Sequence, residues 1–341
     1  MEDTARWFKQ LQQIMIFSDE NRIFSLSPES NFYAMALEIF RYQAENNPVY
    51  GEYISARGIE PGNVSSIKDI PFLPISLFKS RKVVCGDFTP EKVFRSSGTA
   101  GMEHSLHYLY KLSLYEESFL RSFSMFYGDP AGITLYALLP SYLERKDSSL
   151  VYMADRLIAE NREGRGGFFL DNYRELTRRI EGSLLNNENV FLLGVSFALL
   201  NLAEIYAPDL SGLTLIETGG MKGRRKELVR QELHSIFKER MNVKTVHSEY
   251  GMTELLSQAW SKGEGIFYSP PWMRVLTRDP LDPLSSVEKG GRGAINIIDL
   301  ANIYSCSFIE TADLGILHDN GSFEVSGRFD NSDVRGCNLL I

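Results

Sequence analysis

The pattern of apolar and polar residues predicts a helix near the start of the chain. Apolar side chains recur every three or four residues over 32–42, which places them on one helical face. Ser27, Pro28 and Glu29 before this run are typical of a helix start, with a capping hydroxyl and a first-turn proline. Asn46-Asn47-Pro48 is expected to end the helix. The apolar positions are Phe32, Met35, Ile39 and Tyr42.

From about Phe94 onward, strand-like apolar runs alternate with helix-like runs. The expected strands are 133–140, 189–196, 213–218 and 243–251, and the expected helices are 148–160, 197–206 and 226–240. Alternation of this kind indicates parallel sheets covered by helices, the α/β class.

After Ser269-Pro270-Pro271 the chain changes to short β-rich pieces separated by glycine and proline, namely MRVLT, GAINIID and YSCSFIET. We therefore expect two α/β lobes over about 1–190 and 191–268, followed by a small β-rich lobe over 269–326. The last segment, 327–341, is expected to be a hinge and a short tail.

Composition narrows the class of protein. The chain has 341 residues, of which 43% are hydrophobic and 23% charged, with a formal net charge of -8. The acidic balance argues against a nucleic-acid partner, which would need a basic face. The most apolar run, Val190 to Leu200, is too short to span a bilayer. The start has no basic segment leading into an apolar core, and the three cysteines are an odd number, so we expect a cytoplasmic protein with free thiols.

Three loops combine residues that could bind a nucleotide. RSSGTAG, which follows the strand-like EKVF, can wrap backbone N–H groups and hydroxyls around phosphate oxygens. It is not the usual phosphate loop with a following lysine, and a flexible Ser/Gly turn without a ligand is the alternative. EYGMTE ends a strand, where Tyr250 could stack on a base, Thr253 could bind a phosphate and Glu254 could hold Mg²⁺. A glycine turn followed by a capped helix is equally consistent with it. IETGG also ends a strand, and its paired glycines would let a flat ring approach the backbone.

Two later segments extend this set. TADLG places Asp313 between apolar positions at an expected turn, where the carboxylate could accept both ribose hydroxyls or simply cap the turn. GRFD puts Arg328 beside a glycine, as a phosphate or ribose contact next to a hinge at Asp330.

The order of these five motifs resembles the adenylate-forming superfamily of acyl-CoA ligases, peptide-synthetase adenylation domains and luciferases. NPVYGEYISARGIEPGNVSSIKDIPFLP resembles the opening of phenylacetate-CoA ligases. TGGMKGRR, HSEYGMTE and the ending RGCNLLI resemble the acyl-protein synthetases (long-chain-fatty-acid–luciferin-component ligases), which are the synthetase subunits of bacterial fatty-acid reductases.

The resemblance implies ATP and Mg²⁺ as cofactors and assigns a role to each motif. It places Thr253 on the α-phosphate, Glu254 on Mg²⁺ and Asp313 on the ribose. Arg328 would contact the ribose or a phosphate. The residues that would cradle the ATP phosphates are Ser96, Ser97, Gly98, Thr99, Ala100 and Gly101, and those on the nucleotide side are Gly219, Gly220, Tyr250 and Gly251.

The sequence departs from the superfamily pattern at two points. The phosphate loop usually continues Gly-x-Pro-Lys, whereas Met102, Glu103 and His104 follow Gly101 here. His104 and His107 either replace that lysine or belong to a solvated hairpin. Larger members also carry a small C-terminal domain with a catalytic lysine and part of the CoA site, and this sequence ends where that domain would begin. We therefore expect the small domain to be absent.

Cys337 matches the position of the cysteine that acyl-protein synthetases acylate near their own C-terminus. Arg335 beside it would favour the thiolate, which is the nucleophilic form. The alternative is a small apolar residue in a docked tail. Cys85 and Cys306 lie in strand-like runs and are expected to be buried. His247 is expected near the acyl pocket or as a core histidine.

The resulting expectation is an adenylate-forming ligase with Cys337, Thr253 and Glu254 as its catalytic residues. It would convert a carboxylic acid, expected to be a fatty acid, to the acyl-adenylate with release of pyrophosphate. The acyl group would then pass to Cys337 and on to a partner reductase or carrier protein. Two alternatives remain, a compact acyl- or aryl-CoA ligase that uses free CoA and a non-catalytic nucleotide-binding homologue.

Overall fold

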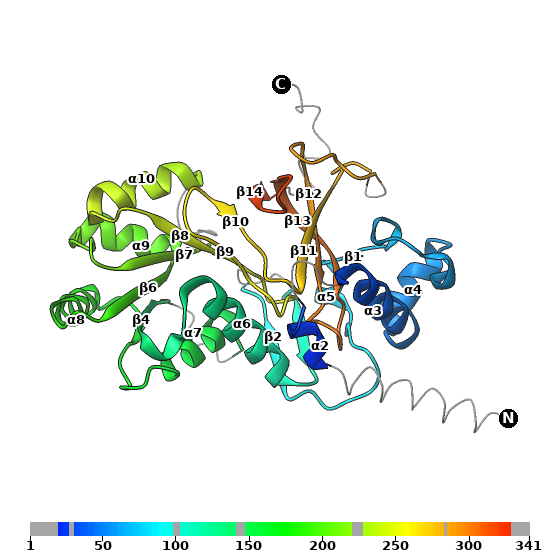
Figure 1. Ribbon diagram of the computed structural model, residues 1–341, viewed down its shortest axis with the longest axis horizontal. Helices are drawn as coiled ribbons and strands as arrows, with labels where there is room; N and C mark the ends of the chain where they lie inside the picture. Colours follow the sequence, from blue (N-terminus) through cyan, green and yellow to red (C-terminus); the bar gives the residue numbers. More distant parts are fainter. Residues whose placement is uncertain are drawn as a thin grey trace.

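The computed structural model describes residues 20–26, 31–97, 103–140, 147–219, 228–282 and 285–328. Two six-stranded sheets and a two-stranded hairpin organise this part of the chain. Figure 1 shows the first sheet with its helices in green and yellow, and the second sheet in orange beside the blue N-terminal helices.

The first sheet has the strand order β5-β4-β6-β7-β8-β9, and every pair in it is parallel except β8 with β9. Strands β4 and β6 are buried along almost their whole length, as expected for central strands covered on both faces. The strands are β4 Ile133–Leu138, β5 Gly167–Phe169, β6 Asn189–Val195, β7 Thr214–Thr218, β8 Val246–Tyr250 and β9 Ala259–Ser261.

Helices cover both faces of this parallel sheet. Phe191 on β6 contacts the rings of Phe123 and Tyr127 on one face, whereas Tyr136 on β4 bonds Ser183 on the other. The register pairs Phe191 with Leu135, the neighbour of Tyr136, so the two contacts lie on opposite faces. The helices are α6 Leu112–Tyr127, α7 Ser149–Ala159, α8 Tyr173–Leu185, α9 Ser196–Asn201, the π-helix Leu202–Tyr206 and α10 Arg230–Met241.

The second sheet is antiparallel in the order β10-β14-β13-β12-β11, and the short strand β1 from the N-terminal part pairs parallel with β13. The sheet of the expected β-rich segment therefore also contains a strand from the N-terminal part of the chain, β1. The strands are β1 Leu73–Pro74, β10 Ile266–Phe267, β11 Met273–Arg278, β12 Arg292–Asp299, β13 Phe308–Leu317 and β14 Phe323–Arg328.

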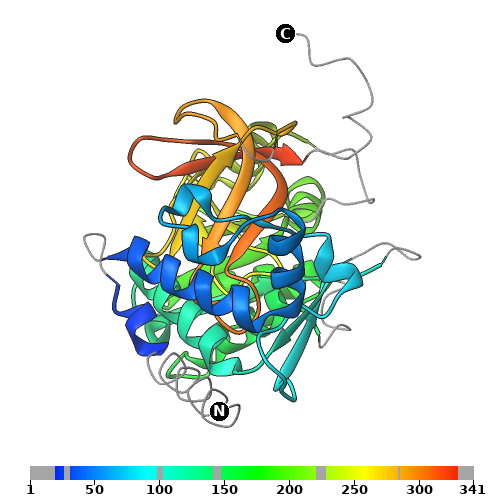
Figure 2. The same ribbon diagram turned by 90° about the vertical axis from the view of Figure 1, so that its right-hand side faces the viewer.

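N-terminal helices pack against the antiparallel sheet, as the view in Figure 2 makes clear. Phe40 and Tyr50 pack their rings against Phe308 of β13. The predicted helix is present as α3 and ends at Asn46 as expected, but it begins at Phe32, after the non-helical Asn31, and not at Ser27-Pro28-Glu29, which lie outside the described residues. The remaining elements are α2 Glu20–Phe24, α3 Phe32–Asn46, α4 Pro48–Ala56, α5 Leu77–Ser80, the 3-10 turns at Pro61–Asn63, Ile67–Asp69 and Pro130–Gly132, and the hairpin strands β2 Lys92–Arg95 and β3 Leu106–Leu109.

The structure also differs from the sequence expectation in three other parts of the fold. TADLG is not a turn, because alternating burial continues from Phe308 to Leu317 and keeps it inside β13, with a bulge between Leu314 and Gly315. No helix follows Glu254 directly, since an irregular loop leads from there into β9. The parallel sheet also runs across residue 190, where the sequence suggested a boundary between two lobes.

Candidate functional site

Two of the predicted loops lie at the same edge of the parallel sheet. Strand β7 ends at Thr218 before Gly219, and the neighbouring β8 ends at Tyr250 before Gly251. The carboxyl edge of such a sheet is where ligands bind in α/β proteins. A Cβ on Gly219 would meet no atom within 4 Å, whereas one on Gly251 would lie 2.4 Å from Glu249 Oε1. A side chain at 251 would therefore have to displace the Glu249 carboxylate, whereas the backbone at 219 faces open space.

The predicted phosphate loop connects β2 to β3. At its start the Ser96 N–H donates to Ser105 O at 3.0 Å, and the Ser105 N–H donates to Ser96 Oγ at 2.9 Å. His104 Nδ1 lies 2.9 Å from Ser96 O. Ser97 is exposed, and Gly98, Thr99, Ala100 and Gly101 lie outside the described residues. The described part thus fixes where the loop leaves and re-enters the hairpin.

The buried Tyr250 and Asp313 and the exposed Arg328 form one polar cluster between the two sheets. The Tyr250 hydroxyl donates to Asp313 Oδ2 at 2.7 Å, and Arg328 Nε lies 3.0 Å from Asp313 Oδ1. Burial and the Asp313 charge raise the pKa of Tyr250 well above its usual value. The tyrosine ring packs against Phe267 and Phe323. Three residues that the sequence assigned to nucleotide binding are therefore in direct contact.

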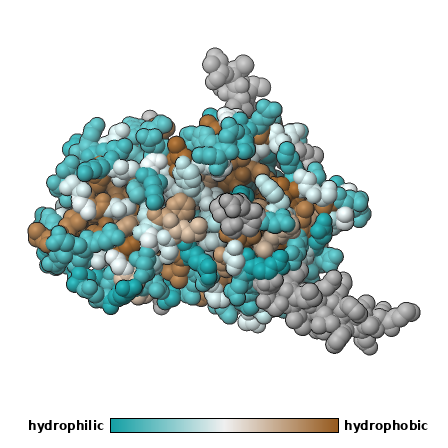
Figure 3. Space-filling view, viewed as in Figure 1, coloured by the Kyte–Doolittle hydropathy of each residue, from teal (hydrophilic) through white to brown (hydrophobic). Residues whose placement is uncertain are grey.

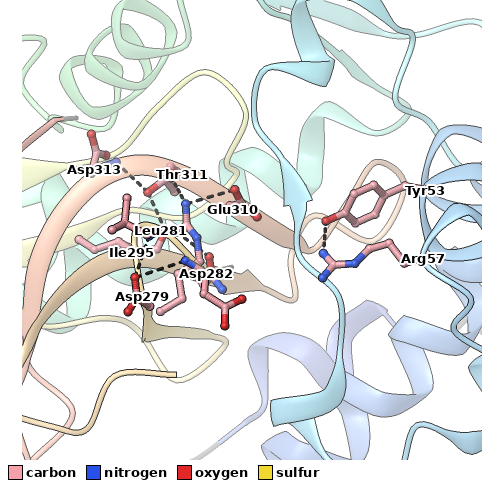
Figure 4. A network of polar contacts seen from close by, with 11 residues as sticks. Tyr53, Arg57, Asp279, Leu281, Asp282, Ile295, Glu310, Thr311 and Asp313 are labelled. Atoms are coloured by element: carbon pink, nitrogen blue, oxygen red, sulfur yellow. Dashed lines mark hydrogen bonds and ion pairs between the residues drawn. The ribbon is translucent and has the colours of Figure 1, made fainter. Parts of the chain in front are cut away.

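The Asp313 carboxylate is placed by a network within the antiparallel sheet. The backbone N–H of Asp313 donates to Thr311 Oγ1 at 3.1 Å. Figure 4 shows Glu310, Thr311 and Asp313 along the same strand. The buried Arg278 guanidinium donates to Thr311 O at 2.9 Å and pairs with Glu310 at 3.2 Å. Burial lowers the pKa of Arg278 from its usual value, while the Glu310 charge opposes that shift. Sequence reasoning missed Arg278, because an arginine in a strand usually points to solvent.

Thr253 and Glu254 lie in the loop after β8, and their backbone carbonyls are held by buried side chains. His107 Nδ1 lies 2.8 Å from Thr253 O, and Asn302 Nδ2 donates to Glu254 O at 2.8 Å. His107 Nε2 lies 3.0 Å from Asn302 Oδ1. These contacts bring the phosphate-loop hairpin and the Thr253–Glu254 loop together.

His107 cannot replace the missing lysine, and it does not belong to a solvated hairpin. Its side chain is 1% exposed and lies behind the loop, against the ring of Phe78. Burial lowers the pKa of His107 to about 4, although its two hydrogen bonds oppose the shift. His247 lies on β8 beside the Tyr127 ring, and burial together with the Lys262 charge lowers its pKa to about 4. Its Nδ1 has no hydrogen-bond partner within the described part of the chain.

Glu249, directly before Tyr250, is a buried acid that the motif analysis did not single out. Burial raises the pKa of Glu249 to about 7, against the hydrogen bond that Thr218 Oγ1 donates to it at 2.6 Å. The Glu217 charge on the neighbouring strand raises it further. The signal in the sequence was a carboxylate within a strand that is otherwise apolar or neutral.

The buried cysteines are as expected. Cys85 and Cys306 are both free and buried, with 1% and 0% of their surface exposed. Burial raises the pKa of the Cys306 thiol to about 12 and that of Cys85 well above its usual value. Neither is a nucleophile in this state. Cys337 and Asp330 lie outside the described residues.

Comparison with solved structures identifies the fold. A 2-hydroxyisobutyryl-CoA ligase solved with 2-HIB-AMP and CoA matches with a TM-score of 0.64 and 13% identity, over 88% of this chain and 68% of that chain. ATP-bound MatB from Rhodopseudomonas palustris matches with a TM-score of 0.50 and 16% identity, over 69% of this chain and 47% of that chain. The chain has the fold of adenylate-forming ligases.

The comparisons with solved structures support the fold of the chain and nothing more specific. The chain spans about half the length of MatB and about two thirds of the hydroxyisobutyryl-CoA ligase. No family model matches the sequence, and no curated protein does. Among the residues described here, no helix is long and apolar enough to cross a membrane. On the face in Figure 3, hydrophobic residues are interspersed with hydrophilic ones.

Proposed function

We propose that the protein activates a carboxylic acid with ATP. A carboxylate oxygen attacks the α-phosphorus, a new P–O bond forms, and the bond to the β-phosphate oxygen breaks. Pyrophosphate leaves with the bonding electron pair, and the acyl-adenylate remains. Such a step depends on positioning and on charge stabilisation, both of which a set of fixed loop residues can supply.

The observation that carries this proposal is the convergence of distant motif residues. The Tyr250–Asp313 hydrogen bond joins the carboxyl edge of the parallel sheet to the antiparallel sheet. The His107 contact with Thr253 adds the phosphate-loop hairpin. These contacts connect segments that are more than 200 residues apart in the sequence, from His107 to Arg328. A structural protein has no need to bring this set of residues together.

The residues present fit a magnesium ion that is held mainly by the substrate. Mg²⁺ usually binds one or two carboxylates together with substrate phosphates. Among the described residues, no group of three or more His, Cys, Asp and Glu side chains could hold a metal by itself. Glu254 is the carboxylate we assign to the ion, which would neutralise charge on the triphosphate. In the same scheme Thr253 hydrogen-bonds the α-phosphate, Asp313 binds the ribose, and Arg328 contacts the ribose or a phosphate.

For the second step we propose Cys337 as the acyl acceptor. Its thiolate would attack the acyl carbonyl carbon, forming a thioester while AMP leaves with the electrons of the broken mixed-anhydride bond. Two observations support this choice, the resemblance of RGCNLLI to the acyl-protein synthetases and the burial of the other two cysteines. The acid would be a fatty acid, and a partner reductase or carrier would receive the acyl group.

Free CoA is the alternative acceptor, and the fold itself favours considering it. The hydroxyisobutyryl-CoA ligase that matches this chain was solved with CoA bound. With CoA as acceptor, AMP release would depend on CoA and would not need Cys337.

The test is the mass of the intact protein after incubation with ATP, Mg²⁺ and a panel of carboxylic acids, followed by peptide mapping. We expect an ATP-dependent acyl adduct that hydroxylamine removes and that maps to Cys337. In Cys337→Ser the adduct should be lost, while acid-dependent pyrophosphate release continues. The matched control is Cys306→Ser, which should retain the adduct. Unchanged labelling of Cys337→Ser would contradict the acceptor assignment, and CoA-dependent AMP release that persists in Cys337→Ser would favour the alternative.

A further inference from the structure

A five-residue segment after β8 is held in place by hydrogen bonds to three buried side chains. The segment is 253–257, and its holders are His107 on β3, Asp299 at the end of β12 and Asn302 in the connection between β12 and β13. The three side chains are at most 1% exposed. We call this arrangement the loop clamp.

Each side chain of the loop clamp holds a different part of the loop. His107 lies 2.8 Å from the Thr253 carbonyl, and Asn302 donates to the Glu254 carbonyl at 2.8 Å. Asp299 Oδ2 accepts from the N–H groups of Leu256 and Ser257 at 2.8 and 3.0 Å. Its Oδ1 accepts from the Ser257 hydroxyl at 2.6 Å.

The orientation of the Asn302 amide is fixed by its hydrogen-bond partners. Its amide N–H groups donate to Glu254 O and, at 3.0 Å, to Cys306 O. Both partners are backbone acceptors, which fixes the amide so that Oδ1 faces His107 Nε2 at 3.0 Å. His107 thus faces two acceptor oxygens, Thr253 O and Asn302 Oδ1, and the neutral ring donates its single N–H to one of them.

We propose that Asn302 and His107 are positioning residues for Glu254 and Thr253. The proposal rests on the proposed function, in which Glu254 holds Mg²⁺ and Thr253 binds a phosphate. A fixed carbonyl limits the backbone angles of its residue and so sets the direction of the side chain. The loop has no helix or strand of its own at these residues to do this. Partners that orient a metal ligand from behind are typically worth about 10- to 100-fold in metal affinity.

The test measures ATP binding by calorimetry with and without Mg²⁺, and the readout is the gain in affinity that Mg²⁺ provides. Asn302→Ala should lose about tenfold of this gain, while its affinity for metal-free ATP stays within about twofold of wild type. Asn302→Leu, which fills the site without a donor, should behave in the same way and guards against a folding defect. His107→Ala should also lose part of the gain, and His107→Asn, whose amide keeps a donor near Thr253 O, should restore it.

Asn47→Ala is the matched control. Asn47 is another buried carboxamide, and it donates to the same connection at Ser305 O, 2.9 Å away, without contacting 253–257. Its loss should leave the Mg²⁺-dependent gain unchanged. A gain that persists in both Asn302 variants, or that Asn47→Ala loses equally, would overturn the proposal.

Failure of the proposed function gives a different result. If wild type shows the Mg²⁺-dependent gain in ATP affinity but no acid-dependent pyrophosphate release, the proposed reaction is wrong, and the binding comparison still decides the role of the loop clamp. If wild type binds no ATP in either condition, both proposals are overturned.

Discussion

The two sheets contribute to the site in different ways. In the parallel sheet the strands are packed from both faces, and the assigned residues Gly219, Thr253 and Glu254 come after strand ends. In the antiparallel sheet Asp313 and Arg328 lie within strands and pair directly across the register. The loop residues take no part in a strand ladder, whereas β13 pairs with both β12 and β14 and lies against the buried Arg278 network. We therefore expect substitutions in the loops of the parallel sheet to lower activity more than stability. Substitutions within the antiparallel sheet should lower the free energy of unfolding as well.

The largest effect is expected from Arg278→Met, which tests the coupling on the antiparallel side. The change removes the ion pair with Glu310 and the guanidinium donors to Thr311 O and Ile295 O. Removing one partner of a buried ion pair costs about 3–5 kcal/mol. The free energy of unfolding from urea titration should fall by this amount. Arg292→Met, at an exposed position of β12, should change it by less than about 0.5 kcal/mol. Equal losses of unfolding free energy in Arg278→Met and Arg292→Met would contradict the coupling proposed for the antiparallel sheet.

Glu254→Gln tests whether activity can be lost without an equal loss of stability on the side of the parallel sheet. Loss of the carboxylate should lower the rate of acid-dependent pyrophosphate release by about 10²–10³-fold, as for other groups that stabilise transition-state charge. The loss of unfolding free energy should be smaller than for Arg278→Met. Glu232→Gln, at an exposed position of α10, is the control and should leave the rate unchanged. A rate for Glu254→Gln close to wild type would remove Glu254 from the metal site.

Glu249→Gln should sharpen the comparison, because Glu249 is a titratable residue inside a strand of the parallel sheet. Its pKa is about 7 in the folded protein, against 4.5 ordinarily. Between these values the unfolded chain has released the proton that the folded chain still holds, so wild-type stability falls as the pH rises. Glu249→Gln removes this slope and should gain up to ~3 kcal/mol relative to wild type between pH 4.5 and 7.5.

Urea titrations of wild type and Glu249→Gln across this pH range measure the difference. Glu232→Gln should keep the wild-type slope. Parallel stability curves for wild type and Glu249→Gln would show that Glu249 is already ionised in the folded protein at low pH.

Asp313→Asn is expected to have the smallest effect of the four. The amide keeps one acceptor oxygen for Tyr250 or the ribose but loses the charge that pairs with Arg328. The KM for ATP should rise about tenfold, as expected for loss of one charged hydrogen-bonding partner worth about 1.5 kcal/mol, while the KM for the acid is unchanged. Glu324→Gln, which removes a surface pair with His318 on the same sheet, is the control. A rise in the KM for the carboxylic acid instead would indicate that Asp313 contacts the acid and not the ribose.

Much of the parallel sheet could be predicted from the sequence. Buried parallel strands are continuous apolar runs, and ITLYALLP and NVFLLGVS became β4 and β6. The helix at 148–160 is present as α7. These elements depend on local periodicity. The resemblance to the adenylate-forming superfamily assigned Tyr250, Asp313 and Arg328 to the nucleotide, and no local pattern marks the contact between Tyr250 and Asp313, which are 63 residues apart.

The missed features depend on long-range polar contacts. Asn302 and Glu254 are 48 residues apart, and His107 and Asn302 are 195 apart, so no local pattern marks their contact. The turn at Asp313 was predicted from TADLG, but pairing with both β12 and β14 keeps the segment extended. Pairing of distant strands decides such segments and overrides local turn preference.

The most direct test of the central claim is the exchange of labelled pyrophosphate into ATP, measured across a panel of aliphatic and aromatic acids. Because acyl-adenylate formation is reversible, the account predicts exchange that requires both Mg²⁺ and an acid, that is reduced about 10²–10³-fold in Glu254→Gln, and that persists in Cys337→Ser. Absence of exchange with every acid, in a protein that binds Mg²⁺ and ATP, would contradict the adenylation reaction.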